Sequence, residues 1–89
     1  MPNKNTAAVV DAFIAGKPLK KCASIWTDGV CVWSYRTIIA CKTAPLRNHA
    51  ILNTHRYSVT TSRHQNGMRV LLRQSGWSTS DERGHMLFA

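Results

Sequence analysis

The first apolar pattern of the chain has the spacing of a helix that buries one side. Its apolar positions are Ala7, Val10, Phe13 and Ile14. Residues three, four and seven apart share one face of an α-helix, so the pattern predicts a helix over residues 5–15. Gly16 suits the position just after a helix, because glycine readily adopts the left-handed conformation found there. The apolar face is expected to be core.

From Lys20 onward, apolar and polar residues alternate in short runs, which is the pattern of strands with one buried face. Thr27-Asp28-Gly29 separates the first two runs, and an Asp-Gly pair tolerates the positive φ angles of a tight hairpin. The predicted strands are residues 21–26, 30–35, 37–42 and 50–58, the last with a turn or bulge at Asn53-Thr54.

A second helix is predicted over residues 62–74, with Gly76 at its end. Its apolar stripe consists of Met68, Leu71 and Leu72. Hydroxyl side chains stand at the expected start, where they can accept hydrogen bonds from the free N–H groups of the first turn. Ser62 with Gln65 three residues later fits the capping-box pattern. The predicted cap residues are Thr60, Thr61, Ser62 and Gln65.

The element order indicates one α+β domain over residues 1–89. We expect a small antiparallel β-meander of three to four strands, packed with an N-terminal helix and a C-terminal helix. Residues 1–4 are a flexible start and residues 5–76 the core. Residues 77–89 are a tail, polar at first and then apolar, which either folds back over the sheet or docks on a partner.

The charge of the chain is strongly positive, since 12 Lys and Arg against 4 Asp and Glu give a net charge of +8. This balance favours an acidic partner, above all nucleic acid, and the alternative is a solvated basic surface. Arg69 and Arg73 are expected one turn apart on the solvent side of the second helix, within reach of one phosphate backbone. The helix start also attracts phosphate. The candidate binding residues are Arg63, Arg69, Arg73, Arg56, Lys20 and Lys21.

Trp26 and Trp33 are placed to face each other across the first predicted hairpin. Two interpretations stay open at this point. The tryptophans form part of the core, which is the commoner role, or they form a stacking platform for single-stranded bases.

The sequence offers little for catalysis. Asp81-Glu82 is the only close pair of carboxylates, and it lies in the polar part of the tail. A nucleophile and base taken from Thr61 or Ser62 with His64 would point in different directions, and capping already explains the hydroxyls. The chain is therefore predicted not to be an enzyme. His64 is instead expected to be partly buried and hydrogen-bonded, tying the helix to the sheet.

The cysteines also favour a structural role. Cys22, Cys31 and Cys41 form an odd set without a C-x-x-C motif. In a reducing cytosol a disulfide framework is not expected, and the three thiols are interpreted as small buried side chains in strands. Neither a metal nor a cofactor is predicted. The chain shows no apolar run long enough for a membrane or a signal peptide, so the cytoplasm is the expected location.

Three blocks of sequence resemble a family of short uncharacterised proteins from bacteriophages and plasmids. They are Thr27-Asp28-Gly29, Ser34-Tyr35-x-Thr37-x-Ile39-Ala40 and Asn53-x-x-x-Tyr57-Ser58-x-Thr60-Thr61-Ser62-x-His64-Gln65. The resemblance spans residues 8–74. It implies an origin on a mobile element and a bacterial host cytoplasm, and it implies no established activity.

These observations predict a non-enzymatic, phage-type binding protein that contacts nucleic acid or a host nucleoprotein complex through a basic face. The alternative is a counter-defence inhibitor, similar to anti-CRISPR proteins, that binds a host defence protein through an acidic groove of that protein. The expected state is a monomer, or a homodimer formed through an exposed sheet edge.

Overall fold

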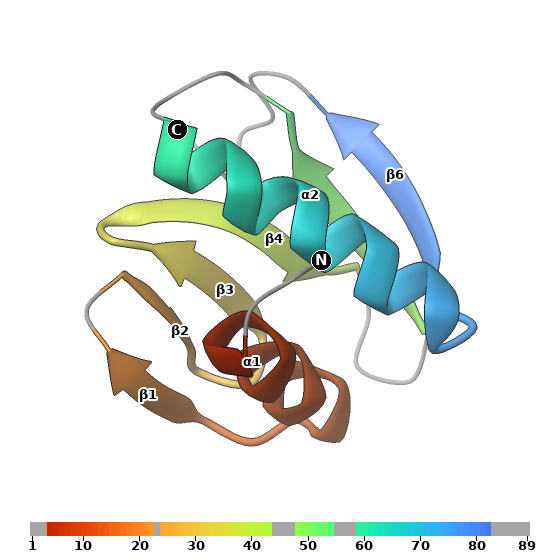
Figure 1. Cartoon of the computed structure of the whole chain (residues 1–89). Helices are drawn as coiled ribbons and strands as arrows, with labels where there is room; N and C mark the ends of the chain where they lie inside the picture. Colours follow the sequence, from red (N-terminus) through yellow and green to blue (C-terminus); the bar gives the residue numbers. More distant parts are fainter. Residues whose placement is uncertain (1–3, 23, 44–47, 55–58, 83–89) are drawn as a thin grey trace.

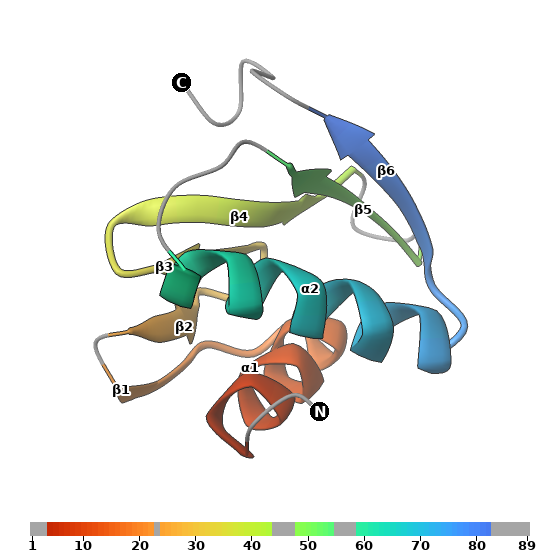
Figure 2. The ribbon, with the colours of Figure 1, turned by 45° about the horizontal axis from the view of Figure 1, so that its top comes forward.

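The chain folds into two layers, a six-stranded sheet and two helices that lie on the same face of it (Figures 1 and 2). The computed structural model describes residues 4–22, 24–43, 48–54 and 59–82. The α+β class and the two predicted helices are confirmed. The expected antiparallel meander of three to four strands is found only in part, because the sheet has six strands and one pair of them is parallel.

The six strands lie in the sheet in the same order as in the sequence. The elements of the chain are α1 (Lys4–Ala15), β1 (Leu19–Cys22), β2 (Ile25–Thr27), β3 (Cys31–Ser34), β4 (Thr37–Lys42), β5 (His49–Asn53), α2 (Val59–Gln74) and β6 (Ser78–Glu82). Strands β1 to β5 form an antiparallel meander, and β6 pairs with β5 in parallel.

Both helices end as the glycines predict. Gly16 follows α1 with φ 74°, and Gly76 follows α2 with φ 83°. In each case the amide of the residue after the glycine reaches back into the last turn of the helix: Lys17 N donates to Ala12 O at 2.9 Å, and Trp77 N donates to Leu72 O at 2.9 Å. This bonding satisfies carbonyl groups that a helix end leaves free.

The predicted strand over residues 21–26 is two strands. The chain reverses between Cys22 and Ile25, which are direct partners of β1 and β2. No glycine, proline or asparagine marks this reversal, so the composition concealed it. The next hairpin, between β2 and β3, was marked in the sequence by Asp28-Gly29. In the structure Asp28 Oδ1 accepts the amides of Val30 at 2.9 Å and Cys31 at 2.8 Å.

The expected tail contributes to the fold. Trp77 is buried, and Ser78–Glu82 forms β6 along the edge of the sheet. A parallel pair of strands needs a connection of a dozen residues or more, and α2 provides it between β5 and β6. Residues 77–82 therefore belong to the core domain, whereas residues 83–89 lie outside the described part of the chain. The predicted end of the fourth strand, residues 55–58, also lies outside it.

The core lies between the sheet and the two helices. Period-two alternation on the strands and the apolar stripes of the helices bring these side chains together. The buried cluster consists of Val9, Val10, Phe13, Ile25, Val32, Ile39, Ala40, Ala50, Leu52, Met68, Leu72 and Trp77.

The end of α1 touches the β2–β3 turn without any side chain between them. Gly29 has φ 97°, and a Cβ atom built on it would lie 2.8 Å from Gly16 O and 2.9 Å from Gly16 C. Both contacts are with backbone atoms, which cannot move aside as a flexible side chain can. This approach fixes the β2–β3 hairpin against the helix.

We expect Gly29→Ala to lower the free energy of unfolding by more than the left-handed backbone alone explains. That conformation costs a residue with a Cβ about 1–2 kcal/mol, and the clash with Gly16 adds to it. Gly76→Ala is the matched control, because Gly76 also has a positive φ but nothing lies within 4 Å of its Cβ position. Urea denaturation measures both variants, and equal losses would contradict the tight contact.

Candidate functional site

The sheet has one face without a helix, which we call the open face. Ile25 and Val32 point from β2 and β3 into the core, so their neighbours Trp26 and Trp33 point to the opposite side. Both tryptophans are half-buried, and neither belongs to the core cluster. The interpretation of these residues as core is therefore wrong.

The two tryptophans belong to a row that crosses four strands. Direct partners in the sheet are Lys20 with Trp26, Trp26 with Trp33, and Trp33 with Ile38. The two indole rings stack with their centroids 4.3 Å apart and their planes 4° from parallel. Lys20 Nζ lies over the Trp26 ring, 5.8 Å from its centroid. We call Lys20, Trp26, Trp33 and Ile38 the aromatic row.

The β3–β4 turn holds the Trp26 ring of the aromatic row. Trp26 Nε1 donates a hydrogen bond to Tyr35 O at 3.0 Å, and Tyr35 N donates to Ser24 O at 3.1 Å. Tyr35 has φ 56°, which is uncommon for a bulky residue. Such a conformation persists where the surroundings enforce it, and it often marks a functional position. The Tyr35 side chain is 49% exposed, and Arg36 beside it is also exposed.

A disulfide lies next to the aromatic row. Cys31 of β3 and Cys41 of β4 are direct partners, with their Cα atoms 4.0 Å apart, and their sulfur atoms are bonded. The expectation of unpaired thiols is wrong for these two residues, because the hairpin register brings them face to face across ten residues of sequence. The side chain of Cys22 lies outside the described part of the structure.

The predicted basic residues are divided between the two layers. Lys20 belongs to the aromatic row, whereas Arg63 and Arg73 are exposed on α2, in the helix layer. The structure therefore does not bring these cations to one surface. Arg56 and the side chain of Lys21 lie outside the described part.

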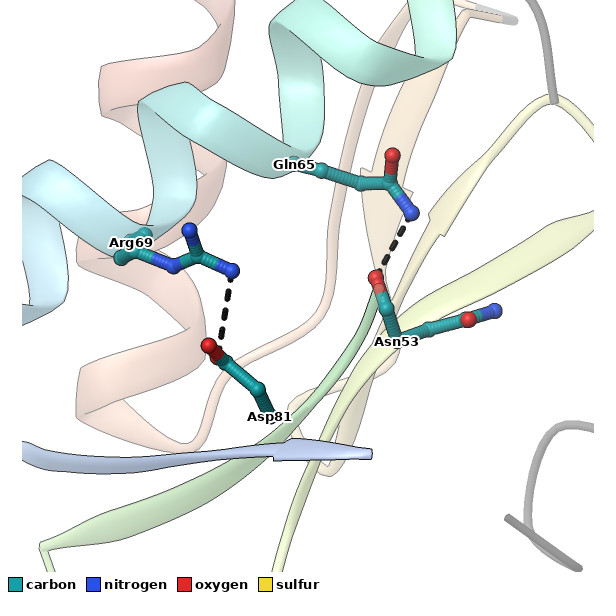
Figure 3. Close-up of polar contacts among 4 residues, drawn as sticks. All are labelled: Asn53, Gln65, Arg69 and Asp81. Atoms are coloured by element: carbon teal, nitrogen blue, oxygen red, sulfur yellow. Dashed lines mark hydrogen bonds and ion pairs between the residues drawn. The ribbon is translucent and has the colours of Figure 1, made fainter. Parts of the chain in front are cut away.

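Arg69 has a structural partner. Its guanidinium donates to Asp81 Oδ1 of β6 at 3.1 Å, which ties the middle of α2 to the edge strand (Figure 3). Arg69 is therefore partly neutralised by Asp81, and its contact with a phosphate backbone together with Arg73 stays a prediction.

The start of α2 also differs from the expectation. The helix begins at Val59, so Thr60, Thr61 and Ser62 lie inside its first turn and not ahead of it. Gln65 Nε2 donates to Asn53 O of β5 at 2.6 Å (Figure 3), which joins the helix to the sheet. The predicted capping box of Ser62 and Gln65 is thus displaced, because the helix extends further toward β5 than the hydroxyl run suggests.

His64 has the role that the sequence predicts. It is 5% exposed, and its Nδ1 lies 2.8 Å from Ser34 Oγ of β3. Ser34 Oγ also lies 3.1 Å from Thr61 Oγ1, so three buried polar side chains satisfy one another between α2 and the sheet. Burial lowers the pKa of His64 below its ordinary value of 6.5. The histidine is therefore neutral at pH 7.

Neither serine–histidine contact of the described residues has the arrangement of a catalytic triad. Ser34 is fully buried, which closes it to a substrate. His49 Nε2 lies 2.8 Å from Ser80 Oγ, where it links β5 to β6. Over residues 4–22, 24–43, 48–54 and 59–82, no carboxylate pairs with either histidine to orient it.

The same described residues lack two other features. No three His, Cys, Asp or Glu side chains there gather into a possible metal site. Neither of the two described helices is long and apolar enough to cross a membrane.

Residues 4–82 match the model of a protein family that spans both helices and all six strands. The chain belongs to the family of unknown function DUF8033. No significant match is found among the curated proteins or the solved structures. The DUF8033 assignment thus covers the whole fold and leaves the role of the aromatic row to physical argument.

The lowered pKa of His64 predicts a loss of stability in acid. The unfolded chain binds a proton near pH 6.5 while the folded chain resists it, so stability is present above that pH and falls as the pH drops below it. The slope is at most about 1.4 kcal/mol per pH unit. Urea denaturation at several pH values measures it. His64→Gln should flatten the profile, and an unchanged slope in this variant would refute the prediction.

The disulfide predicts a second, independent effect on stability. It closes a loop with a sequence separation of ten residues, and a bond across such a loop contributes about 2–3 kcal/mol to the free energy of unfolding. A reducing agent should remove this contribution in the wild-type protein. The Cys31→Ser/Cys41→Ser variant should be less stable by a similar amount and should not respond to the reductant. A wild-type protein indifferent to reduction would show that the bond is absent or without effect.

Proposed function

We propose that this DUF8033 protein binds nucleic acid through the open face of its sheet. The observation that carries the proposal is the aromatic row, in which stacked tryptophans lie beside an exposed cation on a surface that neither helix covers. Aromatic rings and basic side chains together are the contacts that proteins use for bases and phosphates.

The charges of the described residues support this choice of surface. Lys20 beside Trp26 and Arg36 beside Tyr35 have no carboxylate partner among the described residues. Asp81 is paired with Arg69, and Asp28 accepts two turn amides, so these two carboxylates are already engaged. The positive charge at the row is therefore available to phosphate groups.

The aromatic side chains outside the core support it further, since Tyr35 is exposed and Trp26 and Trp33 are half-buried. Tyrosine and tryptophan at a surface bring a large contact area with little loss of side-chain freedom. Here the Trp26 ring is already fixed by its stacking on Trp33 and its hydrogen bond to Tyr35 O. The surface is thus organised before a ligand arrives.

The other expectations from the sequence stay predictions. These are an origin on a mobile element, a cytoplasmic location, the absence of enzymatic activity, and the alternative of a counter-defence inhibitor that binds a host protein.

The proposal predicts salt-dependent binding that depends on the cations at the aromatic row and at the β3–β4 turn. Fluorescence anisotropy with a labelled oligonucleotide, between about 50 and 200 mM salt, gives the slope of affinity against salt. Lys20→Ala/Arg36→Ala should make that slope shallower by about 1.4 on a single strand, because each lost phosphate contact removes about 0.7. The reason is the release of fewer counterions.

Arg63→Ala/Arg73→Ala is the matched control, because it removes the same charge from the helix layer. This variant should bind with nearly the wild-type slope. Equal losses in both variants would show that only the overall charge matters and would reject the open face as the site. Absence of affinity for any oligonucleotide, or affinity that ignores salt, would reject the function.

A further inference from the structure

We infer that the ligand of the open face is single-stranded nucleic acid, and that one of its bases stacks on the face of Trp26 turned toward β1. In this arrangement the Lys20 ammonium leaves the ring and contacts the phosphate of the stacked nucleotide. The inference rests on the proposed function and specifies its substrate class.

The two faces of the Trp26 ring have different neighbours. Trp33 covers one face at a centroid distance of 4.3 Å, with the planes 4° from parallel. The other face is turned toward β1, where Lys20 Nζ stands 5.8 Å from the ring centroid. The first face is occupied by an aromatic ring, and the second is covered by a flexible, exposed side chain.

The position in the sheet makes the second face accessible. β1 lies at the edge of the described sheet, so no other described strand lies beyond Lys20. A flat base can approach from this edge and extend the stack that Trp26 and Trp33 begin. Neighbouring strands of a sheet lie about 4.8 Å apart, so a base placed over β1 can stack in line with Trp26 and Trp33.

The ring is held ready for this contact. The hydrogen bond from Trp26 Nε1 to Tyr35 O, 3.0 Å long, fixes the orientation of the indole. Tyr35 is itself fixed by its hydrogen bond to Ser24 O and by its φ of 56°. A base that stacks here therefore meets a surface that has already lost its side-chain freedom, which favours binding.

When a base takes the place of the Lys20 ammonium over the Trp26 ring, favourable contacts are kept. A lysine over an indole at an exposed site is held weakly, and a phosphate group offers the ammonium a stronger, charged partner. The same nucleotide supplies both the base and the phosphate. Stacking of this kind tolerates every base, because each base has a π face, so we expect little sequence preference.

A duplex cannot make this contact. Its bases are stacked on one another, and only their edges and the phosphates face outward. Wedging the indole against a base face would require unstacking. The geometry of Trp26 therefore points to single strands, and a duplex can interact with the cations alone.

The first experiment needs no protein variant. The wild-type protein is titrated with a single-stranded oligonucleotide, with its duplex, and with an abasic strand of the same length and phosphate content. We expect the base-containing strand to bind about 5- to 150-fold more tightly than the abasic strand, the range that stacking of one base provides. Tryptophan fluorescence should fall with the base-containing strand only.

The second experiment locates the stacked base. Trp26→Phe keeps an aromatic face and should retain the preference for bases over the abasic strand, whereas Trp26→Leu should abolish it. Circular dichroism checks that both variants are folded. If Trp26→Leu does not fold, the abasic comparison on the wild-type protein still decides whether a base stacks on the protein.

The outcomes separate the inference from the proposed function. Equal affinity for base-containing, abasic and duplex ligands, with a steep salt slope, would overturn the inference and leave nucleic-acid binding through charge intact. Loss of affinity for all three ligands would overturn both. Preference for bases that survives in a folded Trp26→Leu variant would place the stacking elsewhere and overturn the assignment to Trp26.

Discussion

Phe13 and Trp77 meet between the two helices, with their ring centroids 5.6 Å apart. Phe13 lies in the last turn of α1, and Trp77 is the third residue after α2. Lys42 of β4 lies over both rings, 5.2 Å from the first and 5.9 Å from the second. The contact joins both helices to the sheet on one side. Because the apolar stripes of both helices are buried on this side, neither covers the opposite face, and that face is left to the aromatic row.

Local signals predicted the elements that local chemistry determines. The strand over residues 37–42 and the glycine after each helix were found with correct positions, since alternation and left-handed caps depend on near neighbours in sequence. β6 was missed because Ser78–Glu82 is polar and becomes a strand only by pairing with β5. The reversal after Cys22 carried no turn residue. Non-local pairing therefore decided the strand count.

The site was predictable to the same extent. Alternation placed Trp26 opposite Trp33, and the pairing is observed. Which face they occupy depends on where α1 packs, and the sequence does not state this. The role of His64 was predicted from its place on the helix, but its partner Ser34 lies thirty residues earlier. The ion pair of Arg69 with Asp81 was not predicted, because Asp81 belongs to a strand that the sequence pattern did not show.

The contact between Gly16 and Gly29 also bears on how the family can diverge. Gly29 lies in a turn, where sequences usually vary freely. Here a side chain would meet the backbone at the end of α1. Position 29 can therefore carry a side chain only if the end of α1 and the β2–β3 hairpin move apart.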